Sequence, residues 1–218
     1  MEEQLKIDFE KILKISDLSK KDIELKKDHL NKFIESGFPS KKQENWKFLD
    51  LNQIIQKNIG ELSFYNDYSI TNKVDTSIFI GGLEHNKIIF VNGRIEKIDF
   101  DYEDKNQIEI YDDVVLVDEF DNKNSLIDLN NAFSHKYYKI LVKKGYVIKK
   151  PLIIYHLTNE KIKSKNINLR LDFELEQNSS LKLVDFFSDT ADKNFMNILY
   201  NFELKKDSVL KNYKIDKS

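Results

Sequence analysis

Histidines are the first candidates for chemistry in this chain, because imidazole binds metals and exchanges protons near neutral pH. The four histidines are far apart in sequence. They form neither the His-Glu-x-x-His pattern of zinc hydrolases nor a His-x-His pair. We interpret each of them as a surface or partly buried residue without a catalytic role: His29, His85, His135 and His156.

Carboxylates are numerous, but their spacing indicates no particular site. Asp99, Asp101 and Glu103 alternate like calcium ligands. An EF-hand loop starting at Asp99 would need Gly and Glu where this chain has Asp104 and Ile110. A further group could supply an acid–base pair. The chain contains 37 acidic residues, however, so this group predicts no catalyst: Asp112, Asp113, Asp118, Glu119 and Asp121.

Several kinds of chemistry are excluded by residues that the sequence lacks. Without cysteine, the chain forms no disulfide, no thiolate nucleophile and no cysteine-held zinc or iron–sulfur site. Gly81-Gly82 belongs to no phosphate-binding loop and is interpreted as a turn. Arg94 and Arg170 are the only arginines, so nucleic-acid binding is not expected. One basic strip is interrupted by acidic residues, so we interpret it as a solvated helix face: Lys20, Lys21, Lys26 and Lys27.

The composition is that of a globular protein with a strongly charged surface. The 218 residues are 40% hydrophobic and 33% charged, with a net charge of −2. This length suits one large domain or two small ones with a real core. No apolar run approaches the ~18 residues of a membrane span, and the acidic N-terminus does not resemble a signal peptide. We therefore expect no membrane association and a cytoplasmic location.

Residues 1–60 have the apolar periodicity of helices. The first helix is expected to end near Ser16-Asp17. Ser19–Asp22 predicts the capping box of a second helix, which ends at Gly37. Ser40–Gln43 predicts another helix start, and Asp50 is expected to cap a short last helix over 51–56. The apolar stripe of the first helix consists of Leu5, Phe9, Ile12 and Leu13.

Residues 61–135 mix helical and strand patterns. Asn92-Gly93 lies between two apolar runs, 87–91 and 94–100, and predicts a tight hairpin because both residues tolerate positive φ. Residues 114–117 predict a short strand, and residues 124–133 predict a helix.

From residue 136 onward, apolar and β-branched runs alternate with short polar breaks. Side chains that alternate along one run should share a face of a strand, as we expect for Leu169, Leu171, Phe173 and Leu175. The runs expected to be strands are 140–142, 152–157, 167–175, 181–187, 195–204 and 209–215.

Three of the polar breaks resemble one another. They surround Gly145, Asn178 and Asp207, at intervals of 33 and 29 residues. Such intervals are typical of a solenoid whose coils stack on one another. A β-sandwich with regular hairpins is the competing interpretation. The sequence stops directly after a strand-like run, so we expect either a natural last strand or part of a longer chain.

The most distinctive stretch is 37–48. It combines a helix stop at Gly37, a turn at Pro39, a new helix start and the single tryptophan. Burial of Trp46 would cover up to ~250 Å². Glu44 could accept hydrogen bonds from helix-start amides or pair with a lysine. We interpret this stretch as a rigid elbow whose residues serve packing and capping.

The elbow resembles the N-terminal signature of the SufD family, a subunit of the SufB–SufC–SufD iron–sulfur cluster assembly complex. The five signature positions expected to be structural are Gly37, Pro39, Glu44, Trp46 and Lys47. Phe38, Ser40, Lys41, Lys42 and Phe48 also match the family pattern. Leu49 departs from it, since the family usually has Thr or Ser there. Similar segments follow at Phe90–Gly93, Leu129–Phe133, Gly145 with Pro151 and Ile153, and Arg170.

The resemblance implies a mainly-β fold with an N-terminal helical region. It implies three parts: helices over 1–60, a mixed α/β connecting region over 61–135, and the opening coils of a right-handed parallel β-helix over 136–218. This β-helix would be partial and truncated at its C-terminal end. The implied function is a non-catalytic scaffold with SufB-like and SufC-like partners. The chain alone would hold no cofactor, and an iron–sulfur cluster would belong to the assembled complex.

Two other classes of function remain open. One is a stand-alone solenoid or sandwich that serves as an interaction module, with dimerisation through an exposed β edge. The other is a β-helix enzyme that acts on a polysaccharide. Such an enzyme would need clustered Asp, Arg or Lys on one solenoid face and a secretion signal, and the sequence shows neither.

Overall fold

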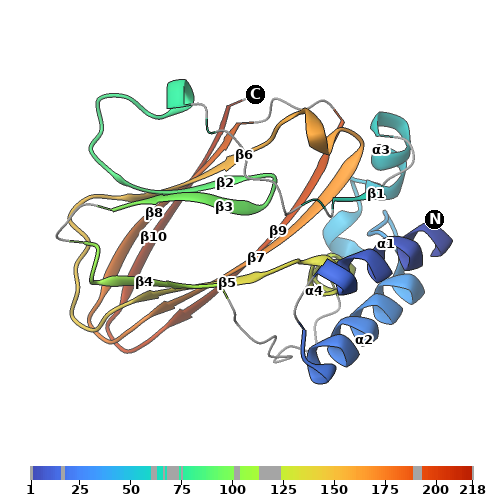
Figure 1. Cartoon of the computed structure of the whole chain (residues 1–218), viewed down its shortest axis with the longest axis horizontal. Coiled ribbons are helices and arrows are strands. Elements are labelled where there is room, and N and C mark those ends of the chain that lie inside the picture. The colour runs from blue at the N-terminus through green and yellow to red at the C-terminus, as the bar shows by residue number, and fades with distance from the viewer. Residues whose placement is uncertain are drawn as a thin grey trace.

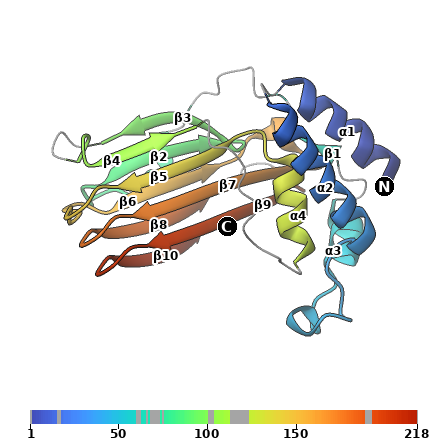
Figure 2. The same ribbon diagram turned by 90° about the horizontal axis from the view of Figure 1, so that it is seen from below.

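A computed structural model shows helices gathered at one end of two β-sheets (Figures 1 and 2). It describes residues 2–15, 18–59, 63–65, 67, 74, 76–100, 104–112, 124–188 and 193–217. The Ser16-Asp17 break and the strand expected over 114–117 lie outside these residues. The molecule is a mixed α/β protein in which strands predominate, so the expected mainly-β fold with some helices is confirmed at that level.

The first two helices form as the sequence predicts. Helix α1 (Glu2–Ile15) buries its apolar stripe in a core shared with α2 (Lys20–Ser36). Ser19 and Asp22 form the predicted capping box. Gly37 ends α2 with a φ of 66°, and its N–H donates to the carbonyl of Phe33 at 2.7 Å. A backbone in this left-handed region favours glycine, which explains why the helix stops there.

The prediction of a helix that starts after Ser40 is wrong. The chain instead makes one short 3₁₀ turn, η1 (Glu44–Trp46), in which Trp46 N–H donates to Gln43 at 2.8 Å. The last predicted helix is confirmed as α3 (Leu51–Asn58). The Asp50 carboxylate accepts the Gln53 N–H at 3.0 Å and so satisfies one of the unpaired amides at the start of the helix.

The predicted hairpin is also confirmed. Strands β2 (Asn86–Val91) and β3 (Arg94–Asp99) pair antiparallel around Asn92 and Gly93, which have φ of 51° and 80°. A second antiparallel pair joins β4 (Ile108–Tyr111) to β5 (Tyr137–Val142). Two smaller elements, β1 (Ser63–Phe64) and the 3₁₀ turn η2 (Thr76–Ile78), belong to the same part of the chain.

From β5 onward, successive strands alternate between two sheets. The six strands are β5 (Tyr137–Val142), β6 (Leu152–Leu157), β7 (Lys165–Leu175), β8 (Ser180–Ser188), β9 (Phe195–Leu204) and β10 (Val209–Lys217), with a 3₁₀ turn η3 (Glu160–Ile162) before β7. One sheet has β7 between β5 and β9, and the other has β8 between β6 and β10. Each of these pairs is parallel. Regular hairpins would have made antiparallel neighbours, so the hairpin-built sandwich is not what forms.

The three similar breaks lie directly on one another. Ser180 N–H donates to the Tyr146 carbonyl at 2.8 Å, and Val209 N–H donates to the Ser179 carbonyl at 2.9 Å. Gly145, Asn178 and Asp207 all have positive φ, between 58° and 73°. The 33- and 29-residue intervals therefore correspond to one stacked turn per pass of the chain.

The space between the two sheets is an apolar core. The residues expected to share one face of β7 are all buried there, together with Leu181 and Leu183 of β8. This confirms the alternation seen in the sequence: Leu169, Leu171, Phe173 and Leu175.

Helix α4 (Ser125–Phe133), predicted from its periodicity, packs across β7 and β9. Its Asn130 amide donates to the carbonyls of Leu169 (3.0 Å) and Asn197 (2.8 Å). Phe133 stacks on Phe64 with ring centres 3.7 Å apart. Helix α4 thereby joins the helical core to the sheets. The three domain boundaries expected from the sequence stay a prediction.

Candidate functional site

The elbow is fixed to the body of the molecule through its first residues. The buried Phe38 ring contacts Phe33 of α2 edge-on (5.2 Å between ring centres) and Phe195 of β9 (6.2 Å). Pro39 is buried as well, and its carbonyl accepts the Leu51 N–H at 3.3 Å. These contacts hold the start of the elbow against both the helices and one sheet.

The signature residues divide into two groups. Pro39 is buried and Trp46 is half-buried against the helical core, while Gly37 is partly buried and ends α2. Glu44 and Lys47 are exposed. The buried and half-buried signature residues pack, whereas the two exposed ones do not. The expectation that all five are structural therefore stays a prediction.

The outer part of the elbow is an exposed tip, which extends away from the helices and sheets in Figure 2. Phe48 is 87% exposed, and Leu49 is 42% exposed beside it. The Lys47 ammonium lies 5.0 Å from the centre of the Phe48 ring. Lys41, Lys42 and Glu44 of the same segment are exposed as well, so the tip presents an aromatic ring among charged side chains. Aromatic residues are enriched at protein interfaces relative to the rest of the protein surface.

Behind the elbow, helices and sheets meet at a buried lysine. Lys26 was expected on a solvated strip, and this is wrong: its side chain is fully buried. Its ammonium donates to the Ser134 carbonyl (2.8 Å), the Asn131 carbonyl (3.1 Å) and the Tyr137 hydroxyl (2.9 Å). Burial lowers the pKa of Lys26 to about 7, and Asp22 partly offsets this. The ammonium thus satisfies carbonyls at the C-terminal end of α4.

Arg170 and the 129–133 segment, two of the family-like features, meet in this same junction. The guanidinium of Arg170 makes two hydrogen bonds to Asp172 (2.9 and 3.1 Å) and one to the Asn131 side chain (3.2 Å). It also lies 5.6 Å from the Tyr137 ring centre. We call this group the junction cluster: Lys26, Asn131, Tyr137, Arg170 and Asp172.

Sequence reasoning missed Lys26 as a member of the junction cluster, although a signal was present. Lys26 precedes Leu30 and Phe33 at spacings of four and seven, so it lies on the apolar stripe of α2. A charged residue on such a stripe indicates a buried polar partner.

The four histidines do not come together. Three are buried, so their interpretation as surface or partly buried residues is wrong: His29, His85 and His156. His29 pairs with Asp128 at 2.8 Å, and His85 contacts the Tyr155 hydroxyl at 2.8 Å. His156 lies between the sheets, where its Nε2 contacts the Tyr200 hydroxyl at 2.7 Å. His135 is half-buried near the start of β5.

The acidic candidates are also dispersed. Asp99 pairs weakly with Lys87 and Lys97, each at 3.7 Å, and Asp112 pairs with Lys136 at 2.8 Å. The other members of the two acidic groups lie outside the described residues: Asp101, Glu103, Asp113, Asp118, Glu119 and Asp121. Within the described part of the chain, no group of three or more potential ligands could hold a metal ion. None of the helices in that part is long and apolar enough to cross a bilayer.

These features define a class: a mixed α/β protein with a helical end, two sheets of stacked parallel strands and an exposed aromatic elbow. No family model matches the chain. Over 174 residues the chain is 22% identical to the iron-sulfur cluster assembly protein SufD of Escherichia coli (strain K12). The similar region includes 75% of this chain and 38% of that protein. The chain is thus similar to less than half of the length of that relative.

Proposed function

We propose that this chain is a SufD-like, non-catalytic scaffold subunit that works with SufB-like and SufC-like proteins in iron–sulfur cluster assembly. The observation that carries the proposal is the similarity to SufD over 174 residues. The resemblance of Gly37–Phe48 to the SufD signature is consistent with it. A cytoplasmic location is part of the same proposal.

We further propose that β5–β10 are the opening coils of a right-handed parallel β-helix. Strands that alternate between two parallel sheets, with one stacked turn per pass, support this reading. In such a fold each coil covers the apolar face of the previous one. The scaffold would then be a rigid rod whose length is set by the number of coils.

In the 218-residue chain, the sheet edge at β10 is a suitable place for a SufB-like partner. In a longer chain, the next coil of the proposed β-helix would take this position. Within the described residues, β10 pairs with β8 alone, so its other side presents unpaired backbone groups. Three large apolar side chains on it are 40–57% exposed: Val209, Tyr213 and Ile215. Addition of a strand from a partner would satisfy the backbone groups and cover these side chains. A second copy of this chain is the alternative occupant of the edge.

In this proposal the iron–sulfur cluster is cargo and not a resident cofactor of the chain. The chain has no cysteine to supply thiolates. The ligands for a nascent cluster would therefore come mainly from the partner. The contribution of this chain would be to hold the partner in place while the ATPase drives rearrangement.

Co-purification tests the proposal. The tagged chain would be isolated from its own cells, once as these 218 residues and once as the full reading frame around them. We expect the longer form to recover both partners and the shorter form to lose the SufC-like ATPase. If the well-folded longer form recovers neither, the chain is a stand-alone interaction module, and the assembly role is wrong.

A further inference from the structure

The outer face of β8 and β10 has two lysines side by side. Leu181 and Leu183 of β8 face the core between the sheets, so the residue between them, Lys182, faces outward. Lys211 of β10 is its direct neighbour in the parallel register. Both lysines are exposed, and within the described part of the chain neither ammonium has an ion-pair or hydrogen-bond partner. Like charges directly opposite each other destabilise a sheet, so this pair lacks a counter-charge in the free chain.

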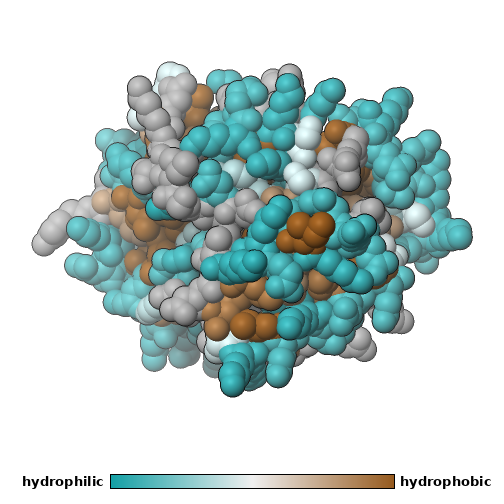
Figure 3. Space-filling view, turned by 45° about the vertical axis from the view of Figure 1, so that its right-hand side comes forward, coloured by the Kyte–Doolittle hydropathy of each residue, from teal (hydrophilic) through white to brown (hydrophobic). Residues whose placement is uncertain are grey.

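Apolar side chains lie on both sides of the lysine pair. On one side, Val209 and Val147 are 50% and 61% exposed, and both pair with Ser180. On the other side, the exposed Tyr213 lies opposite Val184. The face therefore consists of an apolar row, a cationic row and a second apolar row. Small hydrophobic patches are ordinary on a largely hydrophilic surface such as the one in Figure 3, so the distinguishing feature is the lysine pair between two of them.

The carboxylates of these strands do not lie on this face. Asp185 of β8 faces the core, where its carboxylate accepts a hydrogen bond from the Tyr200 hydroxyl. Asp216 of β10 has the same parity as the inward-facing Leu210. Asp207 lies in the turn before β10. Among the described residues, the outward positions of β8 and β10 are lysine, serine and apolar or aromatic residues, so the charge of the face is positive.

The neighbouring part of the same sheet face shows what packs on it. The chain itself crosses β6 there: the Phe79 ring lies 4.7 Å from the Tyr155 ring centre, and the Ile80 N–H donates to the Tyr155 hydroxyl at 3.1 Å. Phe186 of β8 is buried in the same cluster. Tyr213 of β10 stays 57% exposed. The face thus holds an apolar segment over β6 and is open at β10, where the lysine pair lies.

We propose that the outer face of β8 and β10 binds an acidic amphipathic helix of a partner protein, with one carboxylate between Lys182 and Lys211 and an apolar side chain on each side of it. Neighbouring rows on a strand are about 6.6 Å apart, and residues four apart on a helix are about 6 Å apart. The pattern Leu-x-x-x-Glu-x-x-x-Leu therefore matches the three rows. A carboxylate between two ammonium groups makes charge-assisted hydrogen bonds. The proposal does not depend on the role in cluster assembly.

The charge of the face selects this occupant over two others. In a two-fold dimer the face would meet itself, so the lysine pairs of both copies would lie close together and repel. A next coil of the proposed β-helix would extend this face by one strand and would not lie across it. An acidic helix of another protein both neutralises the lysines and packs on the apolar rows.

Peptide binding to the 218-residue chain, followed by fluorescence anisotropy, tests the proposal. The labelled probe is a synthetic helix with the Leu-x-x-x-Glu-x-x-x-Leu pattern. One counterpart has lysine in place of the glutamate, and another has serine in place of both leucines. We expect the first probe to bind most tightly, and Lys182→Gln combined with Lys211→Gln to weaken it about tenfold. The matched control, Lys20→Gln combined with Lys21→Gln, removes two exposed charges from α2 and should leave binding unchanged.

Equal binding of the three probes, or equal effects of the two double variants, would overturn the proposal. Anionic lipid is the other surface that lysines beside apolar residues attract. Vesicles of phosphatidylglycerol and phosphatidylcholine are therefore tested as well. Binding of the chain to these vesicles that the Lys182 and Lys211 double variant abolishes would assign the face to a membrane surface and contradict the proposal.

Two further measurements do not depend on the double variant. With the unaltered chain, binding of the acidic probe should weaken as the NaCl concentration rises, because salt screens exposed charges. Lys211→Glu should raise the urea midpoint of the free chain, since it replaces a repulsive cross-strand pair by an attractive one, and should abolish binding of the acidic probe. A lower midpoint, or binding that salt leaves unchanged, would contradict the unpaired lysine pair on which the proposal rests.

Discussion

The Lys26 ammonium lies 2.9 Å from the Tyr137 hydroxyl, and this contact joins helix α2 to the first strand of the alternating series. The two residues are 111 positions apart in the sequence. Tyr137 also donates to the Asn131 carbonyl at 2.9 Å, so both side chains hold the C-terminal end of α4. The elbow follows α2 directly, so this contact fixes the helix from which the elbow starts.

Replacement of the buried lysine should destabilise the fold. Lys26→Met keeps a side chain of similar length but removes the ammonium that donates to the carbonyls of Ala132 and Ser134. We expect a loss of about 1–3 kcal/mol in the free energy of unfolding, measured by urea denaturation. The control Lys27→Met changes the exposed neighbour on the same helix and should have little effect. Equal stability of the two variants would contradict the role assigned to Lys26.

The same lysine makes stability depend on pH. Burial lowers the pKa of Lys26 from 10.5 to about 7 in the folded chain. Between these values the unfolded chain binds a proton that the folded chain has released, so the free energy of unfolding should rise with pH. Above pH ~10 the raised pKa of Tyr137 acts in the opposite direction, since only the unfolded chain has then lost its proton. Urea midpoints at pH 7 and 9.5 should differ less for Lys26→Met than for the original chain.

The hairpin glycine should tolerate no side chain. A Cβ atom at Gly93 would lie 2.6 Å from the Ile167 side chain, and φ there is 80°. Gly93→Ala should therefore lower the thermal midpoint through both a clash and backbone strain, at a cost of about 1–3 kcal/mol. Gly81→Ala is the matched control, because a Cβ at Gly81 would meet no atom within 4 Å. Similar midpoints for the two variants would contradict the close approach of the hairpin to β7.

The elbow should separate stability from binding. Phe48→Ala removes a ring that is 87% exposed and should change the free energy of unfolding by less than about 0.5 kcal/mol. Trp46→Ala removes a ring that packs on the helical core and should cost more. In the co-purification, Phe48→Ala should recover less of the SufB-like and SufC-like partners although its fold is intact. Full recovery with Phe48→Ala would show that the exposed tip is not a contact surface.

Local signals in the sequence predicted much of this fold. The Ser19–Asp22 capping box, the Asn92-Gly93 turn and the strand over 152–157 depend on nearby residues alone, and the structure has them as expected. After Ser40 the chain forms a turn instead of the expected helix: the Ser40 carbonyl accepts the Gln43 N–H at 3.0 Å, and the 3₁₀ turn η1 follows. The Ser40–Gln43 pattern is compatible with a turn as well as with the start of a helix.

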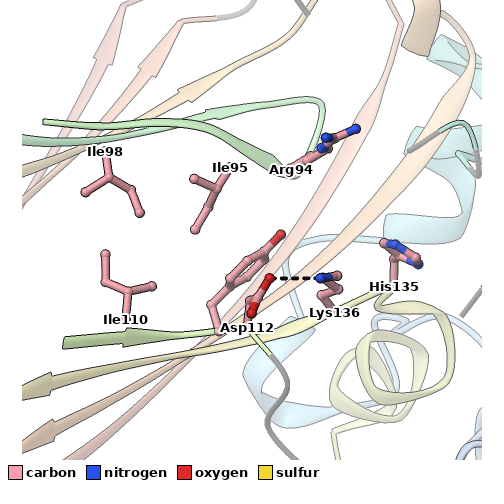
Figure 4. A pocket seen from close by; sticks show the side chains of 8 residues that line it. Arg94, Ile95, Ile98, Ile110, Asp112, His135 and Lys136 are labelled. Atoms are coloured by element: carbon pink, nitrogen blue, oxygen red, sulfur yellow. Dashed lines mark hydrogen bonds and ion pairs between the residues drawn. The ribbon is translucent and has the colours of Figure 1, made fainter. Parts of the chain in front are cut away.

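The junction cluster could not be predicted in this way, nor could the groove between β3 and β4 that Ile95, Ile98 and Ile110 line (Figure 4). Both depend on contacts across the fold, such as Lys26 with Ser134 and the position of β3 opposite β4. The periodicity that places Leu30 and Phe33 in the core counts apolar residues only. Lys26 lies on the same stripe, but its charge led to its assignment to the solvated face. Long charged side chains can occupy such stripes when backbone carbonyls satisfy them.

Direct reconstitution tests the central claim that this chain is a SufD-like scaffold subunit. The purified chain would be mixed with the purified SufB-like subunit from the same cells, and the molar mass of the product measured by light scattering during gel filtration. We predict a one-to-one complex that Tyr213→Lys on the β10 edge weakens. A chain that stays separate from the SufB-like subunit, as a monomer or as a dimer of itself, would contradict the account.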